Sequence, residues 1–579
     1  MTSTPYSAPP TSPWRSAGWL IFGMLVLFAS LAIASGASAG VTPPAVRELP
    51  MPSPDMLGPE VPATWPVAPT GPERQYNVGD PLTLWVFVHV GTPHFEQRAF
   101  TVRGKTDHGY VVVENAEWNV RMFQHDVDML LERWEYSSIG PTPDQGIYEI
   151  DSFNFGIPPD EMDGDVRIFQ VWFNFGNTSD GFFFYFDEYP DGTYPGYRSN
   201  ERECLYLNTN NGQDPSGDYM IAVAAHEFEH MIHWKYDANE DSWVNEGLAE
   251  LGMWLYGHPD QISGFNTMAD NSLIVWGGNW ADYIKTYLWS LYFYERYGGQ
   301  PSIYAAVHQP LNSIAGYDAV LDQFGYTANV SDVFADWAVA NFLDDPSIGD
   351  GRFGYVGETL PAFLVMGTHS TYPVPDQAKT VGHWATDYYR FTTLPGNGLH
   401  LEFDGADNTR FAVWGLGITA TMGTSVSRMT LDSGTQTGVL DMVGLGEPGD
   451  QVILVVAGVS GTGGTNYVYR ASESAADVAE PADLAAAPLR LEMSPNPARG
   501  AVAIRLSWNG PSRVPARVDL FDAAGRLVRS LTAEPSLAGA ASFAWDGSAS
   551  NGRAAAPGIY YARARAGAQT AERRVVRLP

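Results

Sequence analysis

Hydrophobic residues follow two periodicities along the first two thirds of the chain. Short apolar runs bounded by Gly and Asp predict buried strands, and they lie at 82–88, 110–113, 166–173 and 204–207. Helices are predicted by helical spacing of apolar residues, by composition, or by cap and stop signals, and they lie at 122–134, 220–234, 242–255, 283–297 and 333–343. This mixture predicts an α+β region that extends to about residue 365.

Beyond about residue 361 the pattern becomes β again. Runs separated by Gly, Asp and Thr turns predict an antiparallel sandwich, with strands at 388–391, 399–403, 411–414 and 452–456. An Ala-rich segment then precedes a last set of short strands at 502–508, 514–521, 527–531, 541–545, 558–565 and 573–578. Their spacing fits a small Ig-like β-sandwich of about ninety residues.

The amino terminus reads as a targeting segment. An apolar run at 18–34 follows Arg15 and precedes Ala37-Ser38-Ala39, a small-residue cleavage pattern, and this order is typical of a secretory signal peptide. The alternative is an uncleaved anchor, since about 17 apolar residues can just span a bilayer. Both interpretations place the rest of the chain outside the cytoplasm. Residues 40–75 are Pro-rich and read as a spacer or pro-segment.

Charge and cysteine content exclude some classes of protein. The 579 residues carry 33 Lys+Arg against 66 Asp+Glu, a net charge of −33, which argues against binding to nucleic acid. Cys204 is the one cysteine, so no disulfide can form within the chain. The charge is uneven, because residues 490–579 hold 13 Arg and 6 acidic residues. This break in composition predicts a separate C-terminal module.

The chemistry is concentrated in His226-Glu227-Phe228-Glu229-His230. Residues i and i+4 of a helix lie on one face, so both imidazoles can bind one Zn²⁺ ion. Glu227 lies beside them and can accept a proton from water, as in the HExxH motif of metallopeptidases. The surrounding residues are apolar almost all round the helix, which predicts that it is buried. The alternative is a surface helix with two solvated histidines.

A catalytic zinc site needs a third protein ligand. The HExxHxxGxxH pattern is excluded, because His233 and Tyr236 occupy its last two defined positions. Asp237 is one candidate. Glu246 is the better one, since an antiparallel return helix would bring it over the two histidines. Glu250, one turn further on, can accept a hydrogen bond from the outer nitrogen of a zinc-binding histidine. The alternative for both glutamates is a solvated acidic face.

The strings HEFEHMIHWKYD and WVNEGLAEL resemble the gluzincin class of zinc peptidases, which pair HExxH with a downstream glutamate. The fuller sequence is similar to hyicolysin-type secreted bacterial metallopeptidases and, more loosely, to immune-inhibitor-A-type ones, over about 153–355. The resemblance implies a zincin-like fold, in which His226, His230 and Glu246 bind zinc. An oxyanion also needs a hydrogen-bond donor, and the candidates are Tyr283, Tyr287 and His258.

Two acidic segments offer oxygen ligands of the kind that Ca²⁺ prefers. They are Asp160-Glu161-Met162-Asp163-Gly164-Asp165, and Asp187 with Asp191. The alternative is a pair of polar turns. We also expect the segment 199–203 to border a substrate cleft, where a strand edge could pair with an extended peptide.

The C-terminal module carries its own resemblance. The strings FDAAGRLVR, WDG and PGIYY are similar to the Ig-like domain of flagellar hook-capping proteins and to sorting domains of type 9 secretion cargo. The resemblance implies export or attachment, with contact to the cell surface or to secretion machinery. The alternative is a spacer or a carbohydrate-facing accessory domain.

Together these observations predict a multidomain chain: an α+β zincin-like peptidase domain with an N-terminal β segment, an all-β sandwich and an Ig-like β-sandwich. The predicted parts are a signal peptide (1–39), a spacer or pro-segment (40–75), an N-terminal β subdomain (76–118), the peptidase domain (119–365), the accessory sandwich (366–475), a linker (476–489) and the sorting or attachment domain (490–579).

The predicted function is that of a secreted, monomeric zinc endopeptidase acting on protein or peptide substrates. One alternative is a non-catalytic surface or adhesion protein with a relic metal site, but a relic has no need of the base Glu227. Another is a zinc aminopeptidase. It would need an acidic anchor for the substrate amine, and the sequence contains no GxMEN-type motif.

Overall fold

The computed structural model describes residues 75–474, except 89–91, 177–178, 408, 420–422 and 462, and residues 489–577 with short gaps. The predicted signal peptide, the Pro-rich segment and nearly all of the linker lie outside the described residues. Among the helices that the structure describes, none combines the length and the apolar character that a membrane span requires.

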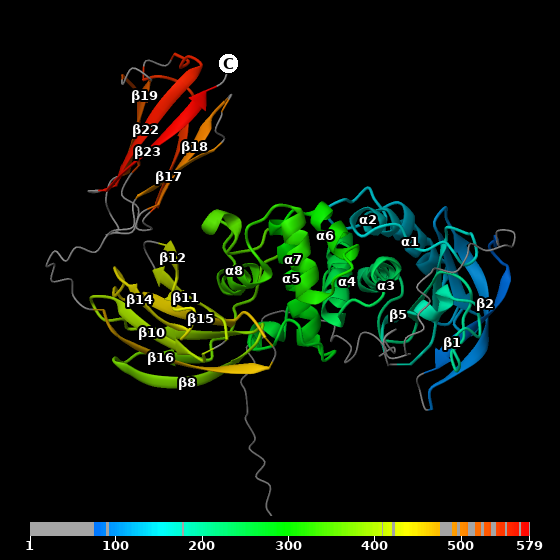
Figure 1. Cartoon of the computed structure of the whole chain (residues 1–579). Coiled ribbons are helices and arrows are strands. Elements are labelled where there is room, and N and C mark those ends of the chain that lie inside the picture. The colour runs from blue at the N-terminus through cyan, green and yellow to red at the C-terminus, as the bar shows by residue number, and fades with distance from the viewer. Residues whose placement is uncertain are drawn as a thin grey trace, which may run out of the picture. The chain divides into compact units, whose positions relative to one another are not determined.

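The first layer is a six-stranded mixed sheet (Figure 1). Its strands are β1 (Pro81–Val88), β2 (His94–Lys105), β3 (Gly109–Glu114), β4 (Ile168–Phe173), β5 (Gly181–Phe183) and β6 (Cys204–Asn208). The order is β1-β2-β3-β4-β6-β5, with β3, β4 and β6 parallel and the other pairs antiparallel. The three parallel strands are buried at every residue, which agrees with their unbroken apolar runs.

The sheet does not respect the predicted boundary at residue 118. Strand β3 pairs with β4 in parallel, from Gly109 with Ile168 to Val113 with Trp172. The β1–β3 segment is therefore part of the same sheet as the strands that precede the HExxH helix, and the expectation of a separate β subdomain at 76–118 is wrong. The physical reason is that β3 is buried throughout, so its free edge needs a hydrogen-bonding neighbour.

Eight α-helices follow or interrupt this sheet in the described residues. They are α1 (Gln124–Glu135), α2 (Ile147–Asn154), α3 (Asp218–Tyr236), α4 (Ser242–Tyr256), α5 (Trp280–Arg296), α6 (Gln300–Val307), α7 (Ser313–Gln323) and α8 (Val330–Leu343). Short 3₁₀ turns are η2 (Tyr185–Glu188), η3 (Phe265–Thr267) and η4 (Gly349–Gly351). The five predicted helices are confirmed as α1, α3, α4, α5 and α8, whereas α2, α6 and α7 were not predicted.

Helix α4 lies against its neighbours at a glycine. A Cβ atom at Gly247 would lie 2.7 Å from the Ser290 hydroxyl and 2.8 Å from the Thr286 carbonyl oxygen, both on α5. Only a residue without a side chain allows the two helices to approach this closely. Helix α4 ends at Gly257, whose φ of 109° is a left-handed C-cap. Gly247 thus allows the close approach of α4 to α5, and Gly257 marks where α4 ends.

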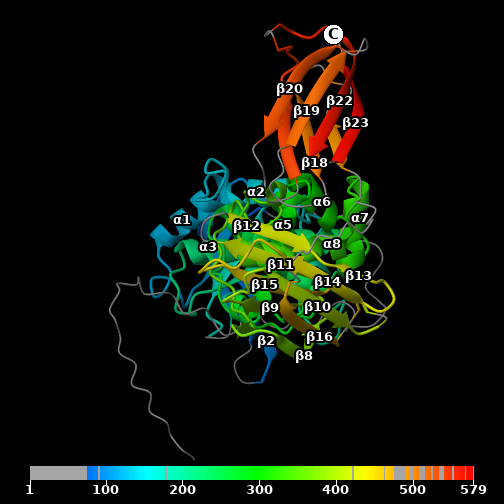
Figure 2. The same ribbon diagram turned by 90° about the vertical axis from the view of Figure 1, so that its left-hand side faces the viewer.

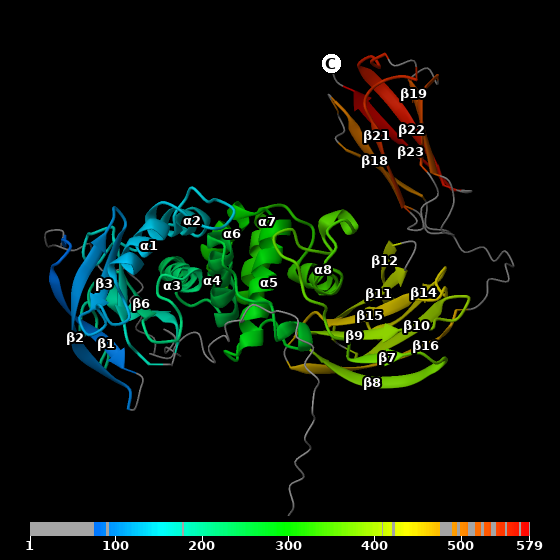
Figure 3. The same ribbon diagram turned by 180° about the vertical axis from the view of Figure 1, so that it is seen from behind.

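The region after the helices is a sandwich of two five-stranded sheets. Its strands are β7 (Gly367–His369), β8 (Val374–Gly382), β9 (Thr386–Phe391), β10 (Leu399–Gly405), β11 (Phe411–Thr419), β12 (Gly423–Arg428), β13 (Thr430–Leu431), β14 (Thr437–Met442), β15 (Gln451–Gly458) and β16 (Gly464–Glu473). The orders are β13-β14-β10-β16-β8 and β12-β11-β15-β9-β7, and the two sheets face each other (Figure 3). Both contribute buried side chains to one core. The predicted antiparallel arrangement is confirmed except at β7, which runs parallel to β9.

The last module is a second two-sheet sandwich (Figure 2). Its strands are β17 (Arg490–Ser494), β18 (Val502–Ser507), β19 (Ala516–Asp522), β20 (Leu527–Ala533), β21 (Ala540–Trp545), β22 (Gly558–Ala566) and β23 (Gln569–Arg577). They form the sheets β17-β18-β21 and β20-β19-β22-β23. Alternate residues of β22 are buried, as expected for a strand with one face on a core. All six strands predicted from the sequence are present.

Candidate metal centre

The HExxH motif lies in the middle of α3, and Glu246 lies on α4. Helix α3 begins after the loop that follows β6, and residues 237–241 connect it to α4. Both His226 and Glu227 are fully buried, and Glu246 is 7% exposed. The connection is short, so α4 returns along α3 and brings Glu246 to the two histidines, as the sequence predicts.

The three predicted ligands present one donor atom each to a common point. The Nε2 atoms of His226 and His230 are 3.2 Å apart, and Glu246 Oε2 lies 3.5 Å from the first and 3.8 Å from the second. Zinc at about 2.0–2.1 Å from its ligands separates them by roughly 3.4 Å in tetrahedral geometry. The donor set and its spacing therefore fit a zinc ion with one further corner available. Among the described residues, this is the one such group of His, Cys, Asp or Glu side chains.

Each histidine also has a carboxylate on its outer side. Glu250 Oε1 lies 3.4 Å from His226 Nδ1, and both side chains are fully buried. Glu229 Oε2 lies 3.6 Å from His230 Nδ1, while its other oxygen lies 3.4 Å from His233 Nδ1. Outer carboxylates of this kind orient a ligating imidazole. The position of Glu250 beside His226 agrees with the prediction, and its role stays a prediction. Glu229 was not predicted, although its position inside the motif could have indicated it.

Of the two alternatives for the third ligand, the geometry favours Glu246. Asp237 is the C-cap residue of α3 and does not belong to the group of side chains that could share an ion. Burial raises the pKa of Asp237, and the nearby His233 opposes that rise. The backbone N–H of Asp237 donates to the His233 carbonyl oxygen, which places Asp237 at the end of α3.

Glu227 packs against the edge of the sheet. A Cβ atom at Gly181 of β5 would lie 2.8 Å from Glu227 Oε1 and 3.1 Å from its Cγ. Strand β5 is the last in the sheet order and lies beside α3 (Figure 1). The predicted base is therefore held between the ligand helix and an edge strand. Gly181 was not identified from the sequence.

The three candidates for oxyanion stabilisation differ in where they lie. The Tyr283 ring is 6.5 Å from the His226 ring, measured between centroids. The Tyr287 hydroxyl donates a hydrogen bond to Glu358 Oε1 at 2.5 Å, and burial together with Glu358 raises the pKa of Tyr287. The His258 ring instead contacts Tyr219, at 6.0 Å. Tyr283 is thus the candidate that the structure brings next to a predicted ligand, and Tyr287 is directed to Glu358.

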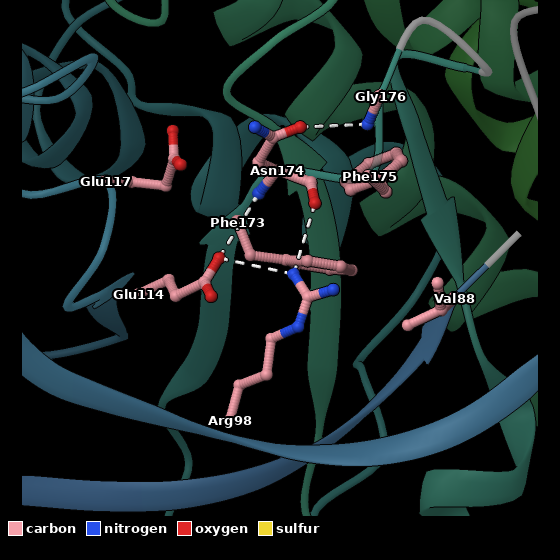
Figure 4. Close-up of a pocket in the computed structure, with 8 residues that line it drawn as sticks. All are labelled: Val88, Arg98, Glu114, Glu117, Phe173, Asn174, Phe175 and Gly176. Atoms are coloured by element: carbon pink, nitrogen blue, oxygen red, sulfur yellow. Dashed lines mark hydrogen bonds and ion pairs between the residues drawn. The ribbon is translucent and has the colours of Figure 1, made fainter. Parts of the chain in front are cut away.

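A separate cavity of about 330 Å³ lies where β3 and β4 end (Figure 4). Arg98 of β2 projects into it, and its Nη1 donates to the Asn174 carbonyl oxygen at 3.2 Å and to Glu114 Oε2 at 3.4 Å. Glu117, also at the wall, pairs with Arg121 at 2.9 Å. The charges of Arg98, Glu114 and Glu117 are therefore compensated within the protein.

Comparison with known families identifies one part of the chain. The family model of the FlgD Ig-like domain matches residues 496–570, which confirms the resemblance of the C-terminal module to flagellar hook-capping proteins. No curated protein matches the chain. The protein is therefore multidomain and β-rich, with several helices and a C-terminal Ig-like domain.

Solved structures resemble the chain only in part. Dimeric latent PorU from Porphyromonas gingivalis is 15% identical over 37% of this chain and 19% of its own, with a TM-score of 0.16. PorZ, a surface component of the type-IX secretion system of the same organism, is 14% identical over 19% of this chain and 14% of its own, with a TM-score of 0.13. Faecalibacterium prausnitzii β-glucuronidase is 15% identical over 33% of this chain and 36% of its own, with a TM-score of 0.11. The match spans less than a fifth of the PorU and PorZ chains, and TM-scores this low decide neither fold nor activity.

Proposed function

We propose that this protein is an exported zinc endopeptidase of the gluzincin type. The observation that carries the proposal is the convergence of His226 Nε2, His230 Nε2 and Glu246 Oε2 within 3.2–3.8 Å of one another. Two neutral imidazoles and a carboxylate form a ligand set found in catalytic zinc sites, which leave one position for water or substrate.

The residues around this group have separate roles in the proposed reaction. When bound, zinc supplies Lewis-acid activation of water and of a carbonyl group. Glu227 accepts a proton from the attacking water and delivers it to the leaving amine. Glu250 and Glu229 orient the imidazole rings of His226 and His230 through the outer nitrogens of those rings. Tyr283, next to His226, is the favoured donor to the developing oxyanion.

The position of β5 supports a polypeptide as the substrate. It is the edge strand of the six-stranded sheet, and its residue Gly181 contacts Glu227. An edge strand presents backbone donors and acceptors to which an extended peptide can add as a further strand. A peptide bound in this way would pass the base side of the metal centre. The predicted cleft segment at 199–203 is directed elsewhere, since Asn200 bonds to Trp85 and Tyr206.

Two other functions remain as alternatives. A non-catalytic surface protein with a relic metal site would have no use for a buried Glu227 beside an edge strand, so that contact favours an enzyme. A zinc aminopeptidase would bind a free substrate amine, and the sequence lacks the GxMEN-type motif for that purpose. Export is proposed from the signal-peptide pattern at 1–39, and surface attachment or sorting from the Ig-like domain at 496–570.

Metal analysis and a casein digest test the proposal together. We expect the purified mature protein to contain one zinc per chain and to cleave casein, and chelation to abolish cleavage. Glu227→Gln should keep the zinc and lose the activity, whereas Glu246→Ala should lose both. Glu295→Gln is the matched control, because this glutamate of α5 accepts hydrogen bonds from Val356 and Gly357 instead. A zinc-loaded wild type that cleaves neither casein nor a peptide library would favour the relic site.

A further inference from the structure

His233 is a buried histidine of α3 that lies one turn beyond His230. Its exposed fraction is 0%, and within the described part of the chain neither of its ring nitrogens has a hydrogen-bond partner. Burying polar nitrogen atoms in this way costs free energy, and an apolar side chain would avoid that cost. The groups beside the ring therefore indicate why a histidine occupies this position.

The carboxylate of Glu229 lies between His233 and His230. Its Oε1 is 3.4 Å from His233 Nδ1, and its Oε2 is 3.6 Å from His230 Nδ1. Glu229 is also fully buried, and its two oxygens accept no hydrogen bond from the described residues. Both separations exceed a typical N–H···O distance by about half an ångström, which a small rotation of the side chains would close. The three side chains therefore form a row that ends at a predicted zinc ligand.

The geometry of α3 explains why Glu229 needs support. Successive side chains on a helix point about 100° apart, so neighbours such as Glu229 and His230 do not face each other. Residues four apart do lie on one face of a helix, and this relation joins Glu229 to His233. Contact with His233 holds one oxygen of the carboxylate, which leaves the other oxygen directed to His230.

The other histidine of the motif has a different arrangement. Glu250 belongs to α4, so the packing of α4 against α3 carries its carboxylate to His226, where Oε1 lies 3.4 Å from Nδ1. Glu229 instead belongs to the same helix as the ring that it contacts. His233 supplies to Glu229 the support that a second helix supplies to Glu250.

The surroundings of this row are acidic. Asp151 of α2 is fully buried, and burial together with the charge of Glu229 raises the pKa of Asp151 well above its usual range. Asp237 and Glu240 follow α3, burial raises the pKa of both, and His233 is among the groups that oppose the rise. An apolar residue in place of His233 would leave Glu229 buried among like charges without this donor, which is costly.

We propose that His233 is a positioning residue for His230 and acts through Glu229. The Nδ1–H group of His233 donates to Glu229 Oε1, and Glu229 Oε2 accepts from the Nδ1–H group of His230. A proton held on Nδ1 of His230 leaves its Nε2 atom as the neutral ring nitrogen that binds a metal ion. This inference rests on the proposed zinc site, to which it adds a residue outside the ligand triad.

The zinc affinity of the full chain tests the proposal, and competition with a chromophoric chelator measures it. His233→Leu removes the donor and should weaken zinc binding by about 10–100-fold. His233→Asn places an amide N–H group where Nδ1 lies and should keep an affinity near that of wild type, whereas the longer amide of His233→Gln should not. His369→Leu is the control, because this half-buried histidine of β7 contacts the Tyr469 hydroxyl instead.

A double-mutant cycle separates positioning from a merely structural role. Glu229→Gln alone should weaken zinc binding, and adding His233→Leu to it should cost little more, because the removed histidine acts through Glu229. Losses that add in full would overturn the proposal, as would wild-type affinity in His233→Leu. If His233→Leu does not fold, equal zinc affinities in His233→Asn and His233→Gln would overturn it instead.

These measurements distinguish the positioning role from the proposed function. A wild-type protein that binds no zinc would refute both. A wild type that binds zinc with an affinity insensitive to His233→Leu would refute the positioning role alone, and the peptidase proposal would stand.

Discussion

Replacing Gly181 by alanine should impair catalysis without removing the metal. The new Cβ atom would lie 2.8 Å from Glu227 Oε1 and 3.1 Å from the Tyr206 carbonyl oxygen, whereas ordinary contact begins at 3.4 Å. Because Tyr206 contributes backbone and Glu227 a side chain, the carboxylate is the group that gives way. It must move by about half an ångström to restore ordinary contact.

The size of the effect follows from that displacement. A misplacement of 1 Å at a reacting group costs about a hundredfold in rate, so a shift of half that size predicts a loss of about tenfold in kcat. Complete removal of the base in Glu227→Gln should cost about 10²–10⁴-fold. The three atoms nearest to the new methyl group belong to Glu227 and Tyr206, and none belongs to His226, His230 or Glu246. Zinc content should therefore stay at the wild-type level.

The assay is steady-state cleavage of a quenched fluorescent peptide, with zinc measured on the same samples. Gly396→Ala is the control, because its Cβ atom would meet nothing within 4 Å. We expect Gly181→Ala to lower kcat and Gly396→Ala to leave it unchanged. If Gly181→Ala turned over peptide at the wild-type rate, or if its loss disappeared on adding zinc, Glu227 would not be positioned by β5.

Three further predictions concern a carboxylate beside a predicted zinc ligand, the contact between α4 and α5, and a buried aspartate of the accessory sandwich. Glu250→Gln should weaken zinc binding by about 10–100-fold, because the carboxylate lies 3.4 Å from His226 Nδ1. Competition with a chromophoric chelator measures the zinc affinity, and an unchanged affinity would exclude an orienting role for Glu250. Gly247→Ala should lower the free energy of unfolding by about 1–3 kcal/mol through overpacking against α5, and a urea midpoint equal to wild type would contradict the close approach. Burial raises the pKa of Asp387 in the accessory sandwich to about 6, above its unfolded value, so its neutral form stabilises the fold at low pH. The free energy of unfolding of wild type, relative to that of Asp387→Asn, should fall by about 3 kcal/mol between about pH 4 and pH 6. Urea denaturation at several pH values measures it, and a constant difference between the two proteins would disprove the assignment.

Much of the secondary structure is encoded locally. Helices α3, α4 and α5 are long apolar segments without proline, so composition and end signals located them to within a few residues. Helices α2 and α6 have eight residues each, which is too short to be stable in isolation. Strand β2 carries charged residues and is only partly buried, so its strand signal is weak. Such elements form because the neighbouring structure stabilises them.

The sequence by itself was enough to indicate the three candidate zinc ligands and the candidate base. The spacing of His226 and His230 is a property of any α-helix, and a short loop is enough to return Glu246 to them. Tertiary structure alone decided that Gly181 touches Glu227. The physical reason is that the spacing of residues along a helix is a local property of the chain, whereas contact between a strand and a helix depends on how the layers pack.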